Sequence, residues 1–157
     1  MSGDRTPRPL LQTSANEQYA RFSPDGRWVA FSSDESGRQE VYVIPFPGPG
    51  GRWLISSDGG TSPRWRRDGR EIYFLKRDTL MAAAVNGQGS VFQAGTATRL
   101  FDANFRTENY QGYGTGSLYD VAPDGQRFLI NIVAAAESAQ TPLTIVTNWT
   151  SLLRAHP

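Results

Sequence analysis

A ten-residue pattern that occurs three times constrains the fold of this chain more than any other sequence feature. The three copies are Phe22–Phe31, Trp65–Phe74 and Val121–Ile130. Each contains an Asp-Gly pair followed by alternating apolar residues, and successive pairs are separated by 43 and then 56 residues. A repeat of about 40–45 residues built from short strands is typical of a propeller blade. The longer second interval therefore predicts a blade with an insertion.

Each copy has the chemistry of a hairpin turn. The turn pairs are Asp25–Gly26, Asp68–Gly69 and Asp124–Gly125. The aspartate can accept hydrogen bonds from backbone amides just ahead of it, and the glycine can adopt the positive φ that other residues resist. Because the three aspartates occupy the same place in different repeats, we interpret them as structural turn residues, not as an acid–base or metal cluster.

Further strands are expected after each hairpin. The third strands are predicted at 40–45, 79–85 and 143–147, and the fourth strands at 53–56 and 98–101. The segment Leu10–Thr13 precedes its turn by the same offset as Trp53–Ser56, so it is predicted to be a fourth strand with no blade in front of it.

These expectations define an all-β chain. We predict a β-propeller fragment of about three four-stranded antiparallel blades over residues 8–153, with hairpin turns at 25, 68 and 124 and an insertion at 102–117. Residues 1–7 are predicted to be a disordered N-terminal tail, and residues 154–157 a C-terminal tail.

Three segments resemble a known repeat family. FSPDGRWVAFSS, EVYVIPFP and YDVAPDGQRFLIN are similar to the PD40, or WD40-like, repeats of TolB-type β-propellers. The closing PLTIVTNWTSLL is similar to the C-terminal end of propellers attached to bacterial eukaryotic-like serine/threonine kinases. The resemblance implies a ring of about six blades that acts as a binding platform or sensor. The chain contains neither kinase motifs nor a Gly-x-Ser-x-Gly nucleophile motif, so the catalytic activities of relatives are not carried over.

Three blades are too few for a closed propeller, which needs about four to eight. An open arc would leave apolar blade faces in water, judged by residues such as Trp28, Phe31, Tyr42, Ile44 and Phe74, and burying each is worth about 1.5–3 kcal/mol. Two solutions remain open at this point. Either the chain is part of a longer propeller, or two copies form a six-bladed ring as a homodimer with twofold symmetry.

Composition removes several classes of function. The chain has no cysteine and a single histidine, His156, so thiolate chemistry, hydrolytic triads and His- or Cys-based metal sites lack their parts. We predict no catalytic residue, no metal and no cofactor. No apolar stretch has the length of a signal peptide or a membrane span, so the chain as written is expected to be cytoplasmic, or extracytoplasmic if it belongs to a longer parent protein.

One basic cluster, Arg64–Arg67 with Arg52 and Arg70 nearby, has the arginines and the tryptophan that can bind single-stranded nucleic acid. However, Trp65 occupies the strand position of Phe22, and the net charge of the chain is only +1. We therefore favour a solvated hairpin and predict no nucleic-acid partner.

The predicted binding face combines the loops between second and third strands with the insertion, because in propellers these segments share one face. Aromatic residues on a loop held by a rigid scaffold are a common means of recognition. The candidate binding residues are Asp34, Glu35, Arg38, Arg77, Asp78, Phe105, Arg106, Glu108, Tyr110 and Tyr113. For the insertion, covering the channel mouth or a blade edge is the equally favoured alternative.

Three functions follow in order of preference. The first is a non-enzymatic scaffold or sensor module that binds a protein or a small ligand. The second is the C-terminal sensor propeller of a membrane serine/threonine kinase whose catalytic domain is absent here. The third is a propeller-fold enzyme, which would need convergent carboxylates or a histidine near the channel axis.

Overall fold

The computed structural model describes residues 6–48, 50–87, 91–103 and 117–132, and the backbone of 143–146. These residues form twelve strands and no helix. The strands are β1 (Glu17–Phe22), β2 (Trp28–Ser33), β3 (Glu40–Pro45), β4 (Trp53–Leu54), β5 (Thr61–Trp65), β6 (Glu71–Lys76), β7 (Thr79–Asn86), β8 (Gln93–Ala94), β9 (Thr98–Asp102), β10 (Tyr119–Val121), β11 (Phe128–Asn131) and β12 (Leu143–Val146). The all-β prediction is confirmed, including a strand at the alanine run of β7.

The strands form three antiparallel sheets, which we call the first blade (β1–β4), the second blade (β5–β9) and the third blade (β10–β12). In the second blade, β8 pairs with the end of β7 at Val85 and Asn86, while β9 pairs with its beginning from Thr79 to Ala82. The five strands therefore make a four-stranded blade whose outer strand is split in two. Within the described residues the third blade has three strands.

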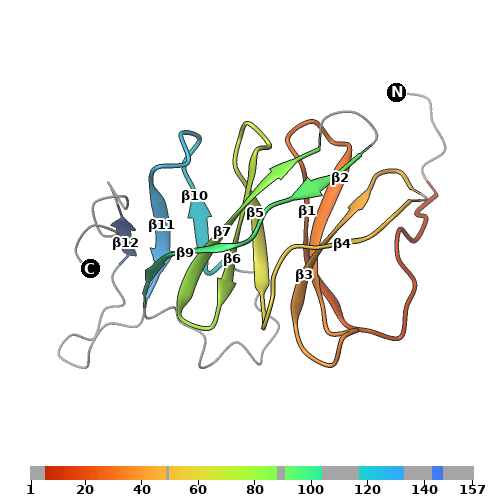
Figure 1. Cartoon of the computed structure of the whole chain (residues 1–157), viewed down its shortest axis with the longest axis horizontal. Helices are drawn as coiled ribbons and strands as arrows, with labels where there is room; N and C mark the ends of the chain where they lie inside the picture. Colours follow the sequence, from red (N-terminus) through yellow and green to blue (C-terminus); the bar gives the residue numbers. More distant parts are fainter. Residues whose placement is uncertain (1–5, 49, 88–90, 104–116, 133–142, 147–157) are drawn as a thin grey trace.

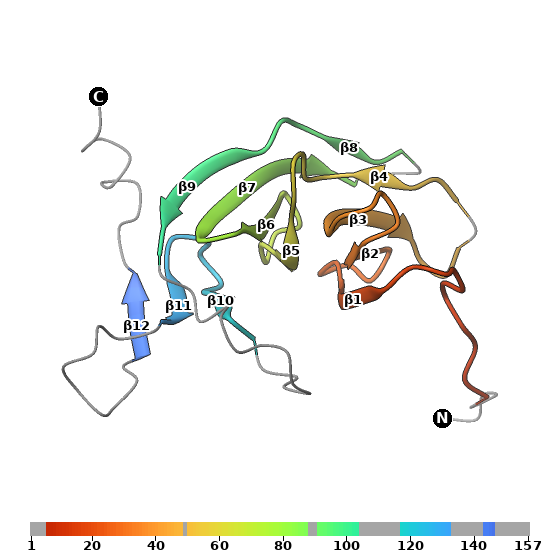
Figure 2. The same cartoon turned by 90° about the horizontal axis from the view of Figure 1, so that it is seen from below.

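The blades stand face to face in an arc. Figure 1 shows them side by side, and Figure 2 shows that β1, β5 and β10 lie along one edge of the arc while β4, β8 and β9 lie along the other. Each blade is a twisted sheet with two apolar faces, so stacking blades sideways buries both faces of the middle one. The predicted propeller fragment is confirmed.

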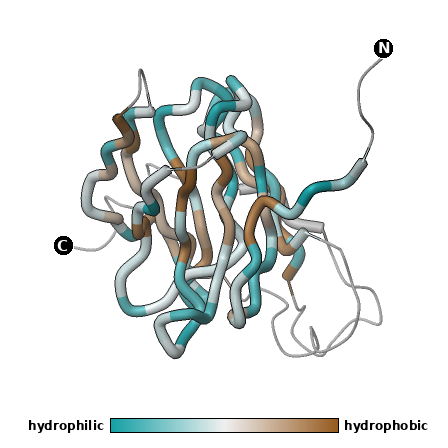
Figure 3. The backbone as a smooth tube through the Cα atoms, turned by 90° about the vertical axis from the view of Figure 1, so that its right-hand side faces the viewer, coloured by the Kyte–Doolittle hydropathy of each residue, from teal (hydrophilic) through white to brown (hydrophobic). Residues whose placement is uncertain are grey.

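Two apolar clusters hold neighbouring blades together. One joins the first and second blades through buried residues such as Trp28 and Phe74. The other joins the second and third blades through Tyr73, Phe101 and Phe128. Figure 3 shows the same pattern along the backbone, with hydrophobic positions within the strands and hydrophilic positions at the turns.

The outer face of the first blade corrects two of our predictions. Leu10–Thr13 forms no strand; instead, Leu11 packs against the apolar cluster on this face. The guanidinium of Arg52 also covers it, 5.6 Å from the ring of Phe31 and 5.5 Å from that of Tyr42. Phe31 and Tyr42 are consequently only 1% and 6% exposed, so the expectation that this face would lie in water was wrong.

The three Asp-Gly turns share one hydrogen-bonding pattern. The glycines have φ values of 72°, 72° and 68°, and each glycine amide donates to the carbonyl three residues earlier. Each aspartate accepts a hydrogen bond from the amide two residues ahead, at 3.1 Å for Asp25, 3.0 Å for Asp68 and 2.9 Å for Asp124. The aspartates therefore stabilise the turns that join the first and second strands of each blade.

No helix in the described part of the chain is long and apolar enough to cross a membrane.

Candidate functional site

The arc has two ends, and both carry polar side chains. We call the end with the turns at 23–27, 66–70 and 122–127 the turn face. The opposite end carries the β2–β3 loop, the β4–β5 connection and the β6–β7 turn, and we call it the loop face; it lies along the lower edge of Figure 1. The predicted binding residues within the described part of the chain belong to the loop face.

Two of these residues bind to their own chain at the edge of the first blade. Asp34 accepts a hydrogen bond from the amide of Asn16 at 2.8 Å, and Glu35 pairs with Arg52. Both contacts fasten the segments that cover the outer face of this blade. The insertion candidates Phe105, Arg106, Glu108, Tyr110 and Tyr113 lie outside the described residues.

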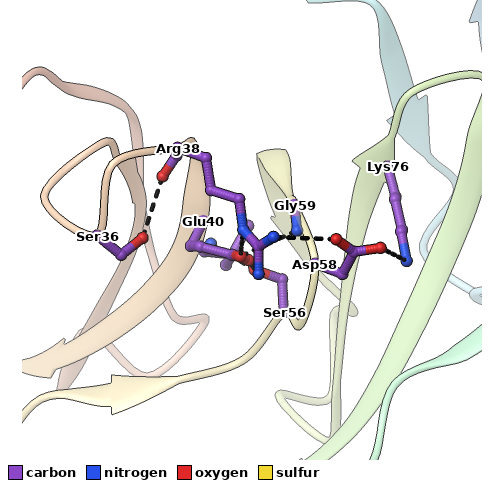
Figure 4. Close-up of polar contacts among 8 residues, drawn as sticks. Ser36, Arg38, Glu40, Ser56, Asp58, Gly59 and Lys76 are labelled. Atoms are coloured by element: carbon purple, nitrogen blue, oxygen red, sulfur yellow. Dashed lines mark hydrogen bonds and ion pairs between the residues drawn. The ribbon is translucent and has the colours of Figure 1, made fainter.

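Arg38 belongs to a polar network that links the first and second blades (Figure 4). Its Nε donates to Glu40 at 2.7 Å, and its Nη1 donates to Asp58 at 2.9 Å. The other carboxylate oxygen of Asp58 lies 3.2 Å from Nζ of Lys76 at the end of β6. One exposed carboxylate thus joins cations from two blades.

Glu40 holds Arg38 in this network from the buried side. Its side chain is only 3% exposed, yet it accepts hydrogen bonds from Arg38, from the hydroxyl of Ser56 and from the amide of Gly59. Burial by itself raises the pKa of Glu40, but these hydrogen bonds outweigh burial, so the net pKa is lowered. Glu40 is therefore a buried, ionised and fully partnered carboxylate.

Charge also controls Asp58. The hydrogen bond and the positive charge of Lys76 hold the pKa of Asp58 below its usual range, and Arg38 and Arg77 add to this effect. Arg77 and Asp78 form the β6–β7 turn, where the carbonyl of Asp78 accepts a hydrogen bond from Ala103 at 2.8 Å. The loop face therefore groups Arg38, Asp58, Lys76 and Arg77.

Sequence reasoning found Arg38 and Arg77 but missed Glu40, Ser56, Asp58 and Lys76. One signal was available for Glu40, since it is a charged residue at the start of an otherwise apolar strand. Asp58 and Lys76 gave no such signal, because each is an ordinary polar residue beside a turn until the two blades are brought together.

The turn face carries a pocket of about 440 Å³ between the first and second blades, which we call the interblade pocket. Asp25 and Asp68 both line it, so two of the three turn aspartates share one cavity. Asp25 accepts a hydrogen bond from Ser23 at 2.6 Å and pairs with Arg27 at 2.8 Å. The hydrogen bond from Ser23, followed by those from Arg27, lowers the pKa of Asp25 to about 2.

The predicted basic cluster is divided among separate places. Arg64 is buried, where its Nη2 donates to Ser117 at 2.5 Å. Arg66 pairs with Glu71 at 3.0 Å on the turn face, whereas Arg52 lies on the outer face of the first blade. These arginines therefore form no common surface patch.

The described residues contain no group of three or more histidine, cysteine, aspartate or glutamate side chains placed to hold a metal ion.

No known family model matches the chain. Among solved structures, it resembles an oligogalacturonate lyase from Vibrio parahaemolyticus, with a TM-score of 0.52 and 18% identity over 77% of this chain and 31% of the other. It also resembles a candidate TolB protein from Agrobacterium tumefaciens, with a TM-score of 0.53 and 15% identity over 87% of this chain and 47% of the other. The chain thus spans less than half the length of either structure. The likeness shows the fold, which is part of a β-propeller.

Proposed function

We propose that this chain is a non-enzymatic binding module and that its loop face contacts the partner, either a protein or a small ligand. The observation that carries the proposal is the Arg38–Asp58–Lys76 network, which places charged groups from two blades on one surface. The side chains of Arg38 and Asp58 are 57% and 74% exposed, while that of Lys76 is 34% exposed. Exposed polar groups held by a rigid scaffold are a common basis of recognition.

The network is fixed at both ends, which supports a role in binding. Buried Glu40 orients Arg38 from the first blade, and β6 supplies Lys76 from the second blade. A partner would meet side chains already in position, so little conformational entropy would be lost when it binds.

The carboxylates of the two faces favour binding over acid–base catalysis. A general acid at neutral pH needs a raised pKa. The pKa values of Asp25, Glu40, Asp58 and Asp124 are instead all lowered. Hydrogen bonds and neighbouring cations stabilise these groups as permanent anions.

We further propose that additional blades complete the ring, supplied by a second copy of the chain or by a longer parent protein. The third blade supports this, because its middle strand exposes 39% of Leu129 and pairs with a β12 that has one free edge within the described residues. Light scattering on the purified chain separates the two sources. A dimer is expected if copies pair, and a stable folded monomer would exclude the homodimer.

A peptide library displayed on phage tests the loop face and needs no identified partner. We expect peptides selected on the native chain to bind Lys76→Glu about 10-fold more weakly, because a charge at an interface has been reversed. The matched control is Arg127→Glu, an exposed ion-paired residue on the turn face of the third blade. Equal loss of binding in both variants, or in neither, would contradict the proposal.

Turnover assays test the non-enzymatic part. Esters, phosphoesters, glycosides and oligouronides are incubated with the purified chain, and no protein-dependent turnover is expected. Turnover that survives repeated purification and disappears in Glu40→Gln or Asp25→Asn would show an enzyme instead.

A further inference from the structure

The interblade pocket has no part in the loop-face proposal, and its chemistry indicates a ligand of its own. It lies on the opposite end of the arc, between the turns of the first and second blades. Its volume of about 440 Å³ falls within the range of small-molecule sites. Its walls are formed by residues of the first and second blades and by Gly87, which directly follows β7.

One wall is apolar and aromatic. Trp28, Trp65 and Val85 line it, and Trp65 is partly exposed. The indole N–H of Trp65 donates to the carbonyl of Arg21 at 3.1 Å, and that of Trp28 donates to the carbonyl of Gly87 at 3.0 Å. Both rings are therefore held in place. Trp28 is buried against Trp53 and Phe92, so the partly exposed Trp65 is the ring that can stack against a flat ligand.

The other wall is charged, with two aspartates and two arginines, and one of the two guanidinium groups has no partner among the described residues. Arg27 pairs with Asp25 at 2.8 Å, and Arg66 lies 3.4 Å from Asp68. This leaves Arg70, which lines the pocket and is exposed. Its guanidinium makes no ion pair or hydrogen bond with the residues that the structure describes, so its N–H groups are available to a ligand.

We propose that the interblade pocket binds a ring-shaped organic carboxylate, with the ring against Trp65 and the carboxylate on Arg70. A guanidinium presents two parallel N–H groups that match the two oxygens of a carboxylate. Both aspartates at the rim have an arginine nearby: Arg27 pairs with Asp25, and Arg66, which also pairs with Glu71, lies near Asp68. These arginines weaken the repulsion between the aspartates and a carboxylate ligand. An aromatic acid and a sugar acid share this chemistry.

Nuclear magnetic resonance of the tryptophan indole N–H groups tests the proposal on the intact chain. The Trp65 signal is assigned by its loss in Trp65→Phe. The charged probes are indole-3-acetate and glucuronate; the neutral counterparts are indole-3-acetamide and glucose, and acetate is the probe without a ring. We expect at least one charged ring probe to shift the Trp65 signal with a dissociation constant of about 1 mM or below. The neutral probes and acetate should bind more weakly.

Matched arginine variants locate the charge. Arg70→Gln should weaken the binding of that probe about 10-fold or more, since a charge-assisted hydrogen bond is lost. Arg67→Gln is the control, because Arg67 is exposed in the same turn but does not line the pocket. Lys76→Glu on the loop face should also leave binding unchanged, which separates this result from the outcome for the loop face.

The probe that binds more tightly identifies the class of ligand. A preference for indole-3-acetate would identify an aromatic acid, and a preference for glucuronate a sugar acid. The proposal is overturned if neither acid shifts Trp65, if the neutral probes bind as well as the acids, or if Arg70→Gln and Arg67→Gln behave alike.

Discussion

The two junctions between neighbouring blades are packed differently on the turn face, although both are formed by copies of the same sequence repeat. Between the second and third blades, Arg66 and Tyr73 fill the space beside Gly125: a Cβ at this glycine would lie 2.9 Å from Arg66 Nε and 2.9 Å from Tyr73 Oη. Between the first and second blades, a Cβ at the equivalent Gly69 would meet only Pro24, at 3.8 Å. The junction between the second and third blades is therefore filled by Arg66 and Tyr73, which we call the plug. The junction between the first and second blades contains the interblade pocket instead.

Repeat alignment explains the difference. Shifted by the 43-residue repeat, Arg66 corresponds to Ser23 and Tyr73 corresponds to Ala30. Two large side chains at one junction are thus replaced by two small ones at the other, and one of the small residues, Ser23, lines the interblade pocket. The Asp-Gly turn is present at both junctions because each blade needs it to join its first two strands. The side chains that pack between two blades are not needed for that turn, so they can differ from one junction to the next.

Removing the plug should have the largest effect. Tyr73 is fully buried, and its hydroxyl donates to Glu71 at 2.8 Å. Tyr73→Ala is expected to lower the free energy of unfolding by about 3–5 kcal/mol, because it opens a cavity that the rigid blades cannot fill. Urea denaturation measures this loss. Tyr73→Phe, which keeps the ring, should cost only about 1 kcal/mol; equal losses in the two variants would show that the ring is not the plug.

The two glycines give a matched comparison of intermediate size. Both have positive φ, so alanine at either position costs about 1 kcal/mol from backbone strain alone. At Gly125 the new methyl group also collides with the plug, so Gly125→Ala should lose about 2–4 kcal/mol in total. Gly69→Ala should stay near 1 kcal/mol, the cost of strain by itself. Similar denaturation midpoints for the two variants would mean that the two junctions are equally packed.

The smallest expected effect is a pH dependence at the pocket. The pKa of Asp25 is about 2 in the folded protein and 3.8 in the unfolded chain. Its ionised form therefore stabilises the fold fully above about pH 4, and this stability is lost as the pH falls towards 2. Because the side chain is 46% exposed, solvent screening reduces the contribution to about 1 kcal/mol. The stability difference between the native chain and Asp25→Asn should shrink over this range; a difference independent of pH would contradict it.

The strands and turns of the repeat could be predicted from the sequence because turn chemistry and strand alternation depend only on residues close together along the chain. The Asp-Gly pairs, the apolar alternation of EVYVIP and the strand at the alanine run of β7 each depend on neighbours within a few residues. The same locality produced the error at Leu10–Thr13. This segment has the sequence offset of an outer strand, but pairing also requires an adjacent strand, and the segment lies instead over the outer face of the first blade.

The sequence by itself determined the all-β class, the turns and the number of blades, since each follows from residues close together along the chain. Only the tertiary structure decided which side chains meet across blades. The Glu40–Arg38–Asp58–Lys76 network, the plug of Arg66 and Tyr73 and the interblade pocket all join residues from different segments. The physical reason is that stacking positions each blade against the next, and the volume and charge left between two blades depend on both of them together.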